Sequence, residues 1–178
     1  AYPRHVVGLV HPGLFTIGDT LTSDPALTFD PIPHFPPECF GLLRTQDISK
    51  HKQFQKGLKQ LEEEGVMQIF YSPDHVRREP VLAAVGELQF DVVMSRLENE
   101  YGVKTSVERL PHALARWIVG DPATISAVYW PSDTIRLVDQ QGRGVMLFTT
   151  EHLLAYCIKS NPSIKFLLRE EVEQTSAQ

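Results

Sequence analysis

The side chains of this chain most able to bind a metal or to transfer a proton are seven histidines and two cysteines. Zinc ligands usually stand in close pairs, such as two cysteines separated by two residues. No histidine has such a spacing to another histidine or to Cys39 or Cys157, so we predict turn and surface histidines and no metal site. His152 and Cys157, five residues apart, would point to different faces of one helix. The other histidines are His5, His11, His34, His51, His75 and His112.

Two carboxylates, Glu87 and Asp91, stand four residues apart at the start of an expected helix. A negative charge there is stabilised against the helix dipole by a few tenths to about 1 kcal/mol. That structural role accounts for both residues. Paired-carboxylate catalysis would also need a cleft and a partner group that the sequence does not display. A small metal-dependent or acid-base enzyme is therefore the less favoured hypothesis.

The stretch Gly142-Arg143-Gly144 has the glycines of a phosphate-binding loop but not its length. A P-loop needs a longer glycine-framed segment that ends in Gly-Lys-Ser/Thr at a helix start, and here another strand follows. We therefore interpret it as a hairpin turn. The sequence also contains no G-x-S-x-G or H-E-x-x-H motif. We expect no catalytic, cofactor-binding or metal-binding residue, and no enzymatic activity, in this stretch of protein.

Two basic groups are the candidate binding residues. Lys50, Lys52 and Lys56 lie on one expected helix, and Arg77 and Arg78 lie on an expected turn at the end of a sheet. A run of charges is usually a solvated helix face. The functional interpretation is contact with RNA, since each neutralised phosphate adds affinity and salt sensitivity. Both interpretations stay open from these residues alone.

The composition limits the class of protein. With 178 residues, 42% of them hydrophobic, the chain can bury a sizeable core, and its net charge of -5 argues against a general affinity for nucleic acid. It has no apolar run of the roughly 18 to 20 residues that span a membrane, and no signal peptide. Two distant cysteines favour a reducing compartment. We expect a cytoplasmic protein, and the start at Ala1 suggests a piece of a longer one.

The first 37 residues predict the end of one domain and a linker. Residues 6–17 are typical of a β-hairpin that turns at Pro12 and Gly13. A lone hairpin is marginal in water, so we interpret residues 1–24 as the last strands of a β-barrel domain. Five prolines between residues 25 and 37 indicate a stiff linker. The exposed hairpin edge also predicts packing on a neighbouring domain or a non-physiological dimer.

Residues 38–174 are predicted to form the C-terminal α+β domain. The expected order over residues 39–108 is βαββαβ, with Ser49 capping the first helix and Gly65 ending it. Helical spacing places Phe54, Leu58 and Leu61 in the core, and Phe90, Val93 and Leu97 form the buried stripe of the second helix. This order predicts a ferredoxin-like sheet with both helices on one face.

The rest of this domain is expected to repeat the pattern as a second, looser α/β unit. Residues 116–119, 134–138, 145–148 and 164–168 are typical of strands. A short helix or turn is expected over residues 122–130 and a helix over residues 152–159. Glu170, Glu171 and Glu173 then lead into residues 175–178, a polar end that is expected to fray.

Several motifs in this chain resemble the family of bacterial peptide chain release factor 3, which belongs to the translational GTPases. The resemblance covers nearly the whole chain. The motifs that carry it are Val7-Gly8-Leu9, residues 17–21, Pro33-x-Phe35-x-Pro37-Glu38-x-Phe40, residues 56–65, residues 86–93 and Ala115-Arg116-Trp117. The same core is similar to the third domain of elongation factor G, but Gln89-Phe90 and Ala115-Arg116-Trp117 favour the release factor.

The resemblance implies a fragment of a GTPase that binds the ribosome after peptide release and promotes the departure of class I release factors. Its GTP-binding domain, which would hold GTP or GDP with magnesium, would precede residue 1. The fragment itself would be structural and would contact RNA and protein of the small ribosomal subunit. It would also hold a fixed orientation to its own GTP-binding domain. The equivalent domain of another translational GTPase stays the alternative.

Overall fold

The computed structural model describes residues 4–9, 18–29, 35–73 and 79–176, and side chains as far as Val172. It divides the chain into two compact units, Ala1–Pro33 and His34–Gln178. In the first unit, the described residues contain turns and no strand; Gly18 turns with a φ of 101°. The predicted hairpin falls largely on residues 10–17, which lie outside the described residues.

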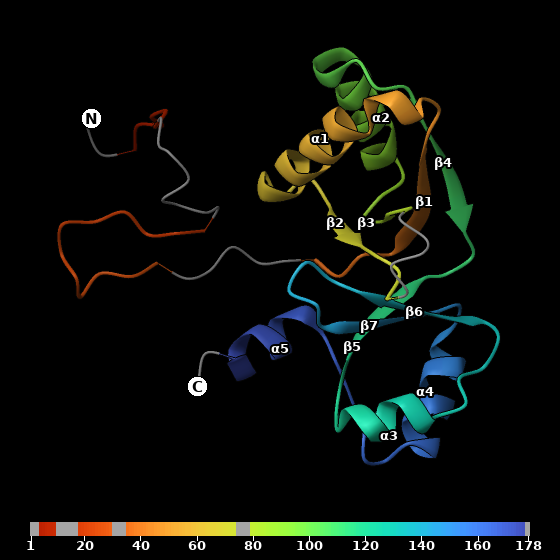
Figure 1. The fold of residues 1–178 in the computed structure, drawn as a ribbon. Coiled ribbons are helices and arrows are strands. Elements are labelled where there is room, and N and C mark those ends of the chain that lie inside the picture. Colours follow the sequence, from red (N-terminus) through yellow and green to blue (C-terminus); the bar gives the residue numbers. More distant parts are fainter. Residues whose placement is uncertain (1–3, 10–17, 30–34, 74–78, 177–178) are drawn as a thin grey trace. The chain divides into compact units, whose positions relative to one another are not determined.

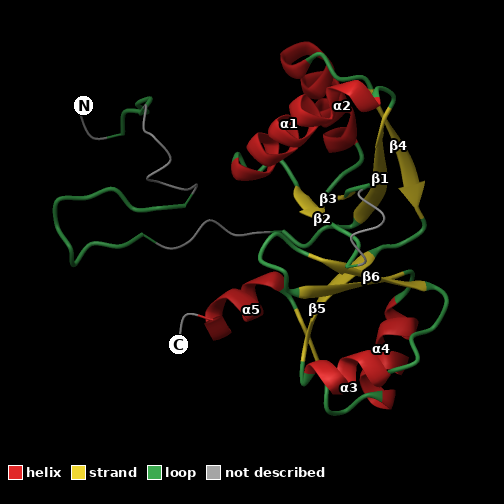
Figure 2. Ribbon diagram, in the orientation of Figure 1, coloured by secondary structure: helices red, strands yellow, loops and turns green. Residues whose placement is uncertain are grey.

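The second unit is an α+β fold with two four-stranded antiparallel sheets and five α-helices in its described part (Figures 1 and 2). Its first half contains β1 (Cys39–Thr45), a 3-10 turn (Ile48–Lys50), α1 (His51–Glu63), β2 (Gln68–Phe70), β3 (Val81–Ala84), α2 (Leu88–Tyr101) and β4 (Thr105–Leu110). Its second half contains β5 (Leu114–Val119), α3 (Pro122–Ala127), β6 (Thr134–Val138), β7 (Gly144–Phe148), α4 (Glu151–Ser160), β8 (Lys165–Leu167) and α5 (Arg169–Ser176).

The two halves share one topology. The strand order is β2-β3-β1-β4 in the first sheet and β6-β7-β5-β8 in the second, so each half is a βαββαβ unit with its first strand inside the sheet. Phe40 faces Ala83 on β3 and Leu110 on β4 across the first sheet, while Trp117 faces Val145 on β7 and Leu167 on β8 across the second. The predicted order of elements in the first half is confirmed. The second half, which was expected to be looser, has the same strand order as the first.

The second unit is built in four layers. Alternate residues of the first sheet, including Leu43 and Ile69, pack against α1 and α2. The intervening residues, including Phe40 and Phe70, pack against Trp117 and the rest of the second sheet. Helices α3 and α4 cover the other face of that second sheet (Figure 1). The sheets therefore meet face to face, with a helical pair outside each one.

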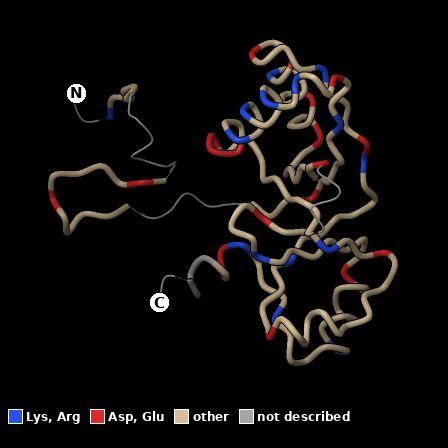
Figure 3. The backbone as a smooth tube through the Cα atoms, viewed as in Figure 1, with Lys and Arg blue, Asp and Glu red and all other residues tan. Residues whose placement is uncertain are grey.

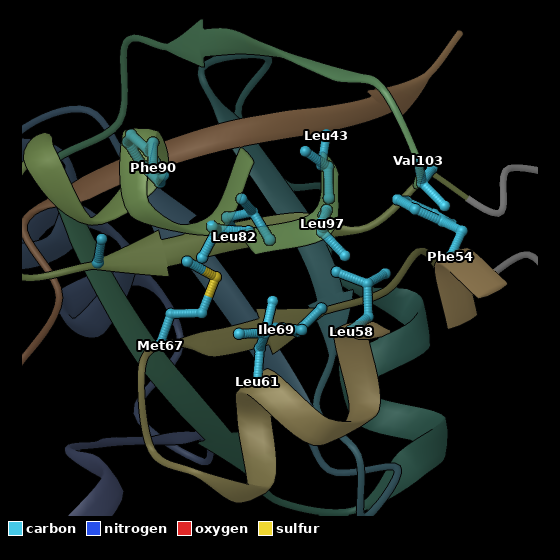
Figure 4. Close-up of a cluster of buried hydrophobic side chains, with 12 residues drawn as sticks. Leu43, Phe54, Leu58, Leu61, Met67, Ile69, Leu82, Phe90, Leu97 and Val103 are labelled. Atoms are coloured by element: carbon cyan, nitrogen blue, oxygen red, sulfur yellow. The ribbon is translucent and has the colours of Figure 1, made fainter. Parts of the chain in front are cut away.

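The core of the first half confirms both predicted helical stripes. Phe54, Leu58 and Leu61 of α1 meet the α2 residues that periodicity assigned to the core, over the sheet residues Ile69 and Leu82 (Figure 4). The α2 residues are Phe90, Val93 and Leu97, each with no exposed surface. This continuous apolar contact fixes the two helices on one face of the sheet.

The ends of α1 and α2 follow local sequence, with one correction. Gly65 and Gly102 adopt left-handed φ angles of 68° and 66° just after the helices end, as glycine permits. The prediction that Ser49 caps α1 is wrong. The N-cap position of α1 is Lys50, which makes no side-chain capping bond, and Asp47 caps the preceding 3-10 turn: its Oδ1 accepts hydrogen bonds from the Ser49 N–H at 2.9 Å and the Ser49 hydroxyl at 2.6 Å. That turn leads directly into α1.

The C-terminal end differs from the expectation of a frayed polar tail. Residues Arg169–Ser176 form α5, which packs against β5. Val172 is only 5% exposed and joins the apolar layer between the sheets. A single buried valine among glutamates gives no visible periodicity, so the sequence pattern did not indicate this helix.

The close approach of α1 and α2 predicts the cost of one substitution. A Cβ atom at Gly57 would lie 2.7 Å from Leu97 Cδ2 and 3.0 Å from the Tyr101 ring. We expect Gly57→Val to lower the free energy of unfolding by about 1 to 3 kcal/mol, because overpacking displaces buried side chains. Urea unfolding followed by circular dichroism measures it. Gly86→Ala, where a Cβ would meet nothing within 4 Å, is the control and should change stability by less than about 0.5 kcal/mol. Equal stability of the two variants would contradict the close helix contact.

Candidate functional site

The histidines do not assemble into a chemical site within the described residues. His5 and His152 are exposed, and His112 is buried in the connection between β4 and β5, where burial lowers its pKa. In residues 4–9, 18–29, 35–73 and 79–176, no three His, Cys, Asp or Glu side chains are close enough to hold a metal ion. Three further histidines, His11, His34 and His75, lie outside the described residues.

The two suspected carboxylates serve the start of α2. Glu87 forms an ion pair with Arg109 at 3.2 Å, and the Arg109 guanidinium lies 4.6 Å from the centre of the Phe90 ring. Asp91 is exposed in the first helical turn. The pair is thus split between a surface ion pair and solvent, and the geometry provides no shared proton.

Basic residues recur along α1 (Figure 3); the candidates Lys52 and Lys56 belong to this helix, and Lys50 directly precedes it. Lys52 and Lys56 are exposed, stand one helical turn apart and form no ion pair within the described part of the chain. Lys50 differs, because its Nζ donates a hydrogen bond to the Gly102 carbonyl oxygen at 2.6 Å and so ties α1 to the end of α2. Lys59 forms an ion pair with Glu63 at 3.6 Å. Lys52 and Lys56 are therefore the two lysines on this helix that are free to bind a partner.

Several arginines near α1 and α2 are already neutralised by carboxylates. Arg44 contacts Glu79 at 3.3 Å and Glu108 at 2.9 Å. Arg96 contacts Glu64 at 2.5 Å and Glu100 at 2.7 Å, and these ion pairs lower the pKa of both carboxyl groups. Lys52 and Lys56 differ from these arginines because no described carboxylate neutralises their charge. The other candidates, Arg77 and Arg78, lie outside the described residues.

A polar joint, which we define as Glu62, Ile69, Gln140 and the backbone bridge between Tyr71 and Val138, connects the two halves. The Glu62 carboxylate accepts hydrogen bonds from the Ile69 N–H at 3.3 Å and from the Gln140 side-chain amide. Tyr71 and Val138 exchange two backbone hydrogen bonds of 2.8 Å. Burial raises the pKa of Glu62 to about 7, against the opposing effect of these donors. Folding therefore favours the protonated form of this carboxyl group.

A buried carboxylate, that of Asp139, fixes the β6–β7 hairpin to the sheet interface. Asp139 is 8% exposed and accepts hydrogen bonds from Trp117 Nε1 at 2.8 Å and from Arg143 Nε at 2.6 Å. Its other oxygen accepts the backbone N–H groups of Gln141 and Arg143. The four donors satisfy a charge that would otherwise be costly to bury. Gly142-Arg143-Gly144 is thus part of a hairpin turn, as predicted.

Sequence reasoning missed Glu62 and Asp139 as the residues that join these elements. Glu62 belongs to the run Glu62-Glu63-Glu64, in which nothing distinguishes the member that becomes partly buried. Asp139 had a detectable signal, since an aspartate shortly before a glycine commonly accepts backbone hydrogen bonds in a turn. Its bond to Trp117, 22 residues away, needed the structure.

The comparisons with known proteins agree with the motifs. The family described as "Class II release factor RF3, C-terminal domain" matches residues 29–158. The chain belongs to this family. It is 46% identical over 165 residues to peptide chain release factor 3 of Nostoc punctiforme and 47% identical over 165 residues to that of Cyanothece sp.. Each alignment covers 93% of this chain and 30% of the relative, so the chain spans about 30% of the length of these relatives.

The family match decides between the two resemblances, to release factor 3 and to elongation factor G. The chain is similar to the C-terminal domain of a release factor of translation termination, and the expected resemblance is confirmed. The release factor 3 of Gloeobacter violaceus is 46% identical over 167 residues, again 93% of this chain and 32% of the relative.

Among the described helices, none is both long and apolar enough to cross a membrane.

The polar joint predicts a pH dependence of stability. The pKa of Glu62 is raised in the folded state, so its contribution is fully present below the unfolded value of 4.5 and is lost as the pH rises towards about 7. We expect Glu62→Gln to be more stable than the unaltered chain at pH 8, by on the order of 1 to 3 kcal/mol, with a smaller difference at pH 5. Urea unfolding at both pH values measures this.

The matched control is Glu63→Gln, which changes the exposed neighbour of Glu62. Its stability should follow that of the unaltered chain at both pH values, since a surface ion pair such as that of Glu63 with Lys59 contributes little. A loss of stability at pH 8 in Glu62→Gln would contradict the account, in which ionisation of a partly buried carboxyl group destabilises the fold.

Proposed function

We propose that this chain is the ribosome-contacting C-terminal module of a translation-termination GTPase. The whole protein would bind the ribosome after peptide release and promote the dissociation of class I release factors. GTP or GDP with magnesium would bind in a domain outside this chain, and the module would act by contact and orientation instead of chemistry. Membership of the release factor 3 family supports this proposal. We also place the protein in the cytoplasm.

The observation that supports a ribosome contact is that two lysines on α1 form no ion pair with any described residue. Lys52 and Lys56 project from one helical face, and the net charge of the whole chain is -5. A local basic face on an acidic protein directs binding to one orientation, because the remaining surface repels phosphates. We propose that this face contacts RNA phosphates of the small ribosomal subunit, with a smaller share for Lys50, which already binds Gly102. We retain Arg77 and Arg78 as a second contact.

The architecture that presents this face is part of the same proposal. We infer that each βαββαβ half is a ferredoxin-like unit, which the strand orders support. We further propose a barrel remnant over residues 1–24, a linker over residues 25–37 and the C-terminal domain over residues 38–174. A stiff module and a defined linker suit a protein that switches by rotating its domains as rigid bodies. The module would therefore hold its orientation to the GTP-binding domain.

The lysine contact predicts the effect of charge reversal. We expect Lys52→Glu combined with Lys56→Glu to weaken the binding of this chain to purified small ribosomal subunits by at least tenfold. The dependence of log affinity on log salt concentration should also become shallower by about 1 to 2, because two phosphate contacts are lost. Sedimentation binding assays between 50 and 200 mM salt measure both quantities.

The control variant reverses two other exposed lysines. Lys159 at the end of α4 and Lys165 on β8, both changed to Glu, alter the net charge equally but lie in the second half. This control should keep its salt dependence and lose little affinity. Equal loss in both variants would indicate a general charge effect, and an unchanged affinity in the Lys52 and Lys56 variant would refute the proposed face. Changing Arg77 and Arg78 to Glu in the same way tests the second contact.

A further inference from the structure

Two arginines of the second half, Arg116 on β5 and Arg136 on β6, lie in one row across the second sheet. Each stands directly opposite Met146 of β7, which separates them. Directly opposite residues of antiparallel strands have their side chains on the same face of the sheet. Strands are spaced by about 4.8 Å, so the backbones of the two arginines are about 10 Å apart. Both arginines, which we call the arginine row, therefore belong to the face on which Met146 packs with α3 and α4.

The arginine row differs from other arginines of the second unit because no carboxylate neutralises it. Arg136 is exposed, and its side chain forms no hydrogen bond or ion pair with any residue that the structure describes. Arg116 is half-buried, and its Nη1 donates a hydrogen bond to the Ala115 carbonyl oxygen at 2.8 Å, on the same strand. Four other arginines each lie 2.5 to 3.2 Å from a carboxylate oxygen: Arg44, Arg96, Arg109 and Arg143. A chain with a net charge of -5 thus keeps two unneutralised cations on one face.

Unneutralised guanidinium groups on one face select an anionic ligand. Like charges repel each other, and a bound anion relieves that repulsion. The planar guanidinium group donates two parallel N–H bonds to a carboxylate or to a phosphate. The chemistry of the arginine row therefore suits an acidic protein segment or a nucleic acid, and its place in the fold favours the protein.

The arginine row lies at the opposite end of the four layers from the lysines of α1. Helices α1 and α2 cover the outer face of the first sheet, and the arginine row belongs to the outer face of the second (Figure 1). The next step rests on the proposed function. A module that contacts ribosomal RNA through Lys52 and Lys56 turns Arg116 and Arg136 away from that RNA. The arginine row is then left for a protein partner, whose anionic groups are carboxylates.

We propose that the arginine row binds an acidic, extended segment of a partner protein. One carboxylate of the segment pairs with Arg136, and a second carboxylate, about 10 Å further along, pairs with Arg116. A segment in the polyproline II conformation places residues three apart on one side, about 9 Å from each other, so two residues separate the two acidic ones. The module then has two binding faces at its two ends, lysines for RNA and arginines for protein.

Synthetic peptides with blocked ends test the proposal on the unaltered chain. The first is an eight-residue proline peptide with glutamates at positions 3 and 6. The second has its glutamates at positions 4 and 5, and the third has lysines at positions 3 and 6. In nitrogen-15 NMR titrations we expect the first peptide to shift the side-chain Nε–H signals of Arg116 and Arg136. The second should bind at least about threefold more weakly, because it reaches one arginine at a time. The third should leave both signals in place.

Substitutions test the two arginines directly. Arg136→Gln, at an exposed position, and Arg116→Gln should each weaken the binding of the first peptide about fivefold, because one charged hydrogen bond is lost. The matched control is Arg44→Gln, which removes a charge that carboxylates already neutralise and should change the affinity by less than about twofold. Lys52→Glu with Lys56→Glu should also leave the affinity within about twofold at 100 mM salt, where distant charges are screened.

The proposal and the ribosome contact can therefore fail independently. Peptide binding without shifts at Arg116 and Arg136, equal binding of the lysine peptide or of the peptide with adjacent glutamates, or no binding at millimolar concentration would each overturn the proposal. An eight-nucleotide single-stranded RNA that shifted both arginines at lower concentration than the first peptide would also overturn it. If the expected shifts occur but Lys52 and Lys56 do not contact the ribosomal subunit, the proposed function fails and the acidic-peptide site stands.

Discussion

The contact between the two sheets is the interaction on which the rest of this structure depends. Each sheet has two apolar faces, and helices cover only one of them, so the remaining faces must bury each other. Phe70 of the first sheet meets Trp117 of the second edge to face, with ring centroids 5.8 Å apart. Each such buried side chain contributes about 1.5 to 3 kcal/mol by its removal from water. Without this contact, both halves would expose an apolar sheet.

This contact also explains where the polar residues of the interior lie. Two carboxylates accept hydrogen bonds from backbone and indole donors in this region: the partly buried Glu62 at the polar joint and the buried Asp139 beside Trp117. Helix α1 packs on the face of the first sheet that points away from the second sheet, so its exposed lysines take no part in the contact between the sheets.

Much of the fold could be predicted from the sequence, because local periodicity determines it. The spacing of Phe54, Leu58 and Leu61 was sufficient to orient α1, and the hairpin between β6 and β7 followed from its glycines. The face-to-face sheets were not predicted, although β3 is buried on both faces, since a short apolar strand does not reveal what covers it. The joint depends on Gln140, 78 residues from Glu62, and α5 on one buried valine. Such long-range partners leave no pattern within a segment. The lysines stood out because helical spacing placed them outside the core.

The central claim is that the two βαββαβ halves form one cooperative body joined through their sheets. Native-state hydrogen exchange tests it most directly, by comparing the opening free energies of amides in β1, in β7 and in the bridge of Tyr71 with Val138. The account predicts that β1 and β7 open with the same free energy, equal to that of global unfolding, and that Glu62→Gln, which stabilises the chain at pH 8, raises both opening free energies together. A second sheet that opens by about 2 kcal/mol more easily while the first stays protected would contradict the account.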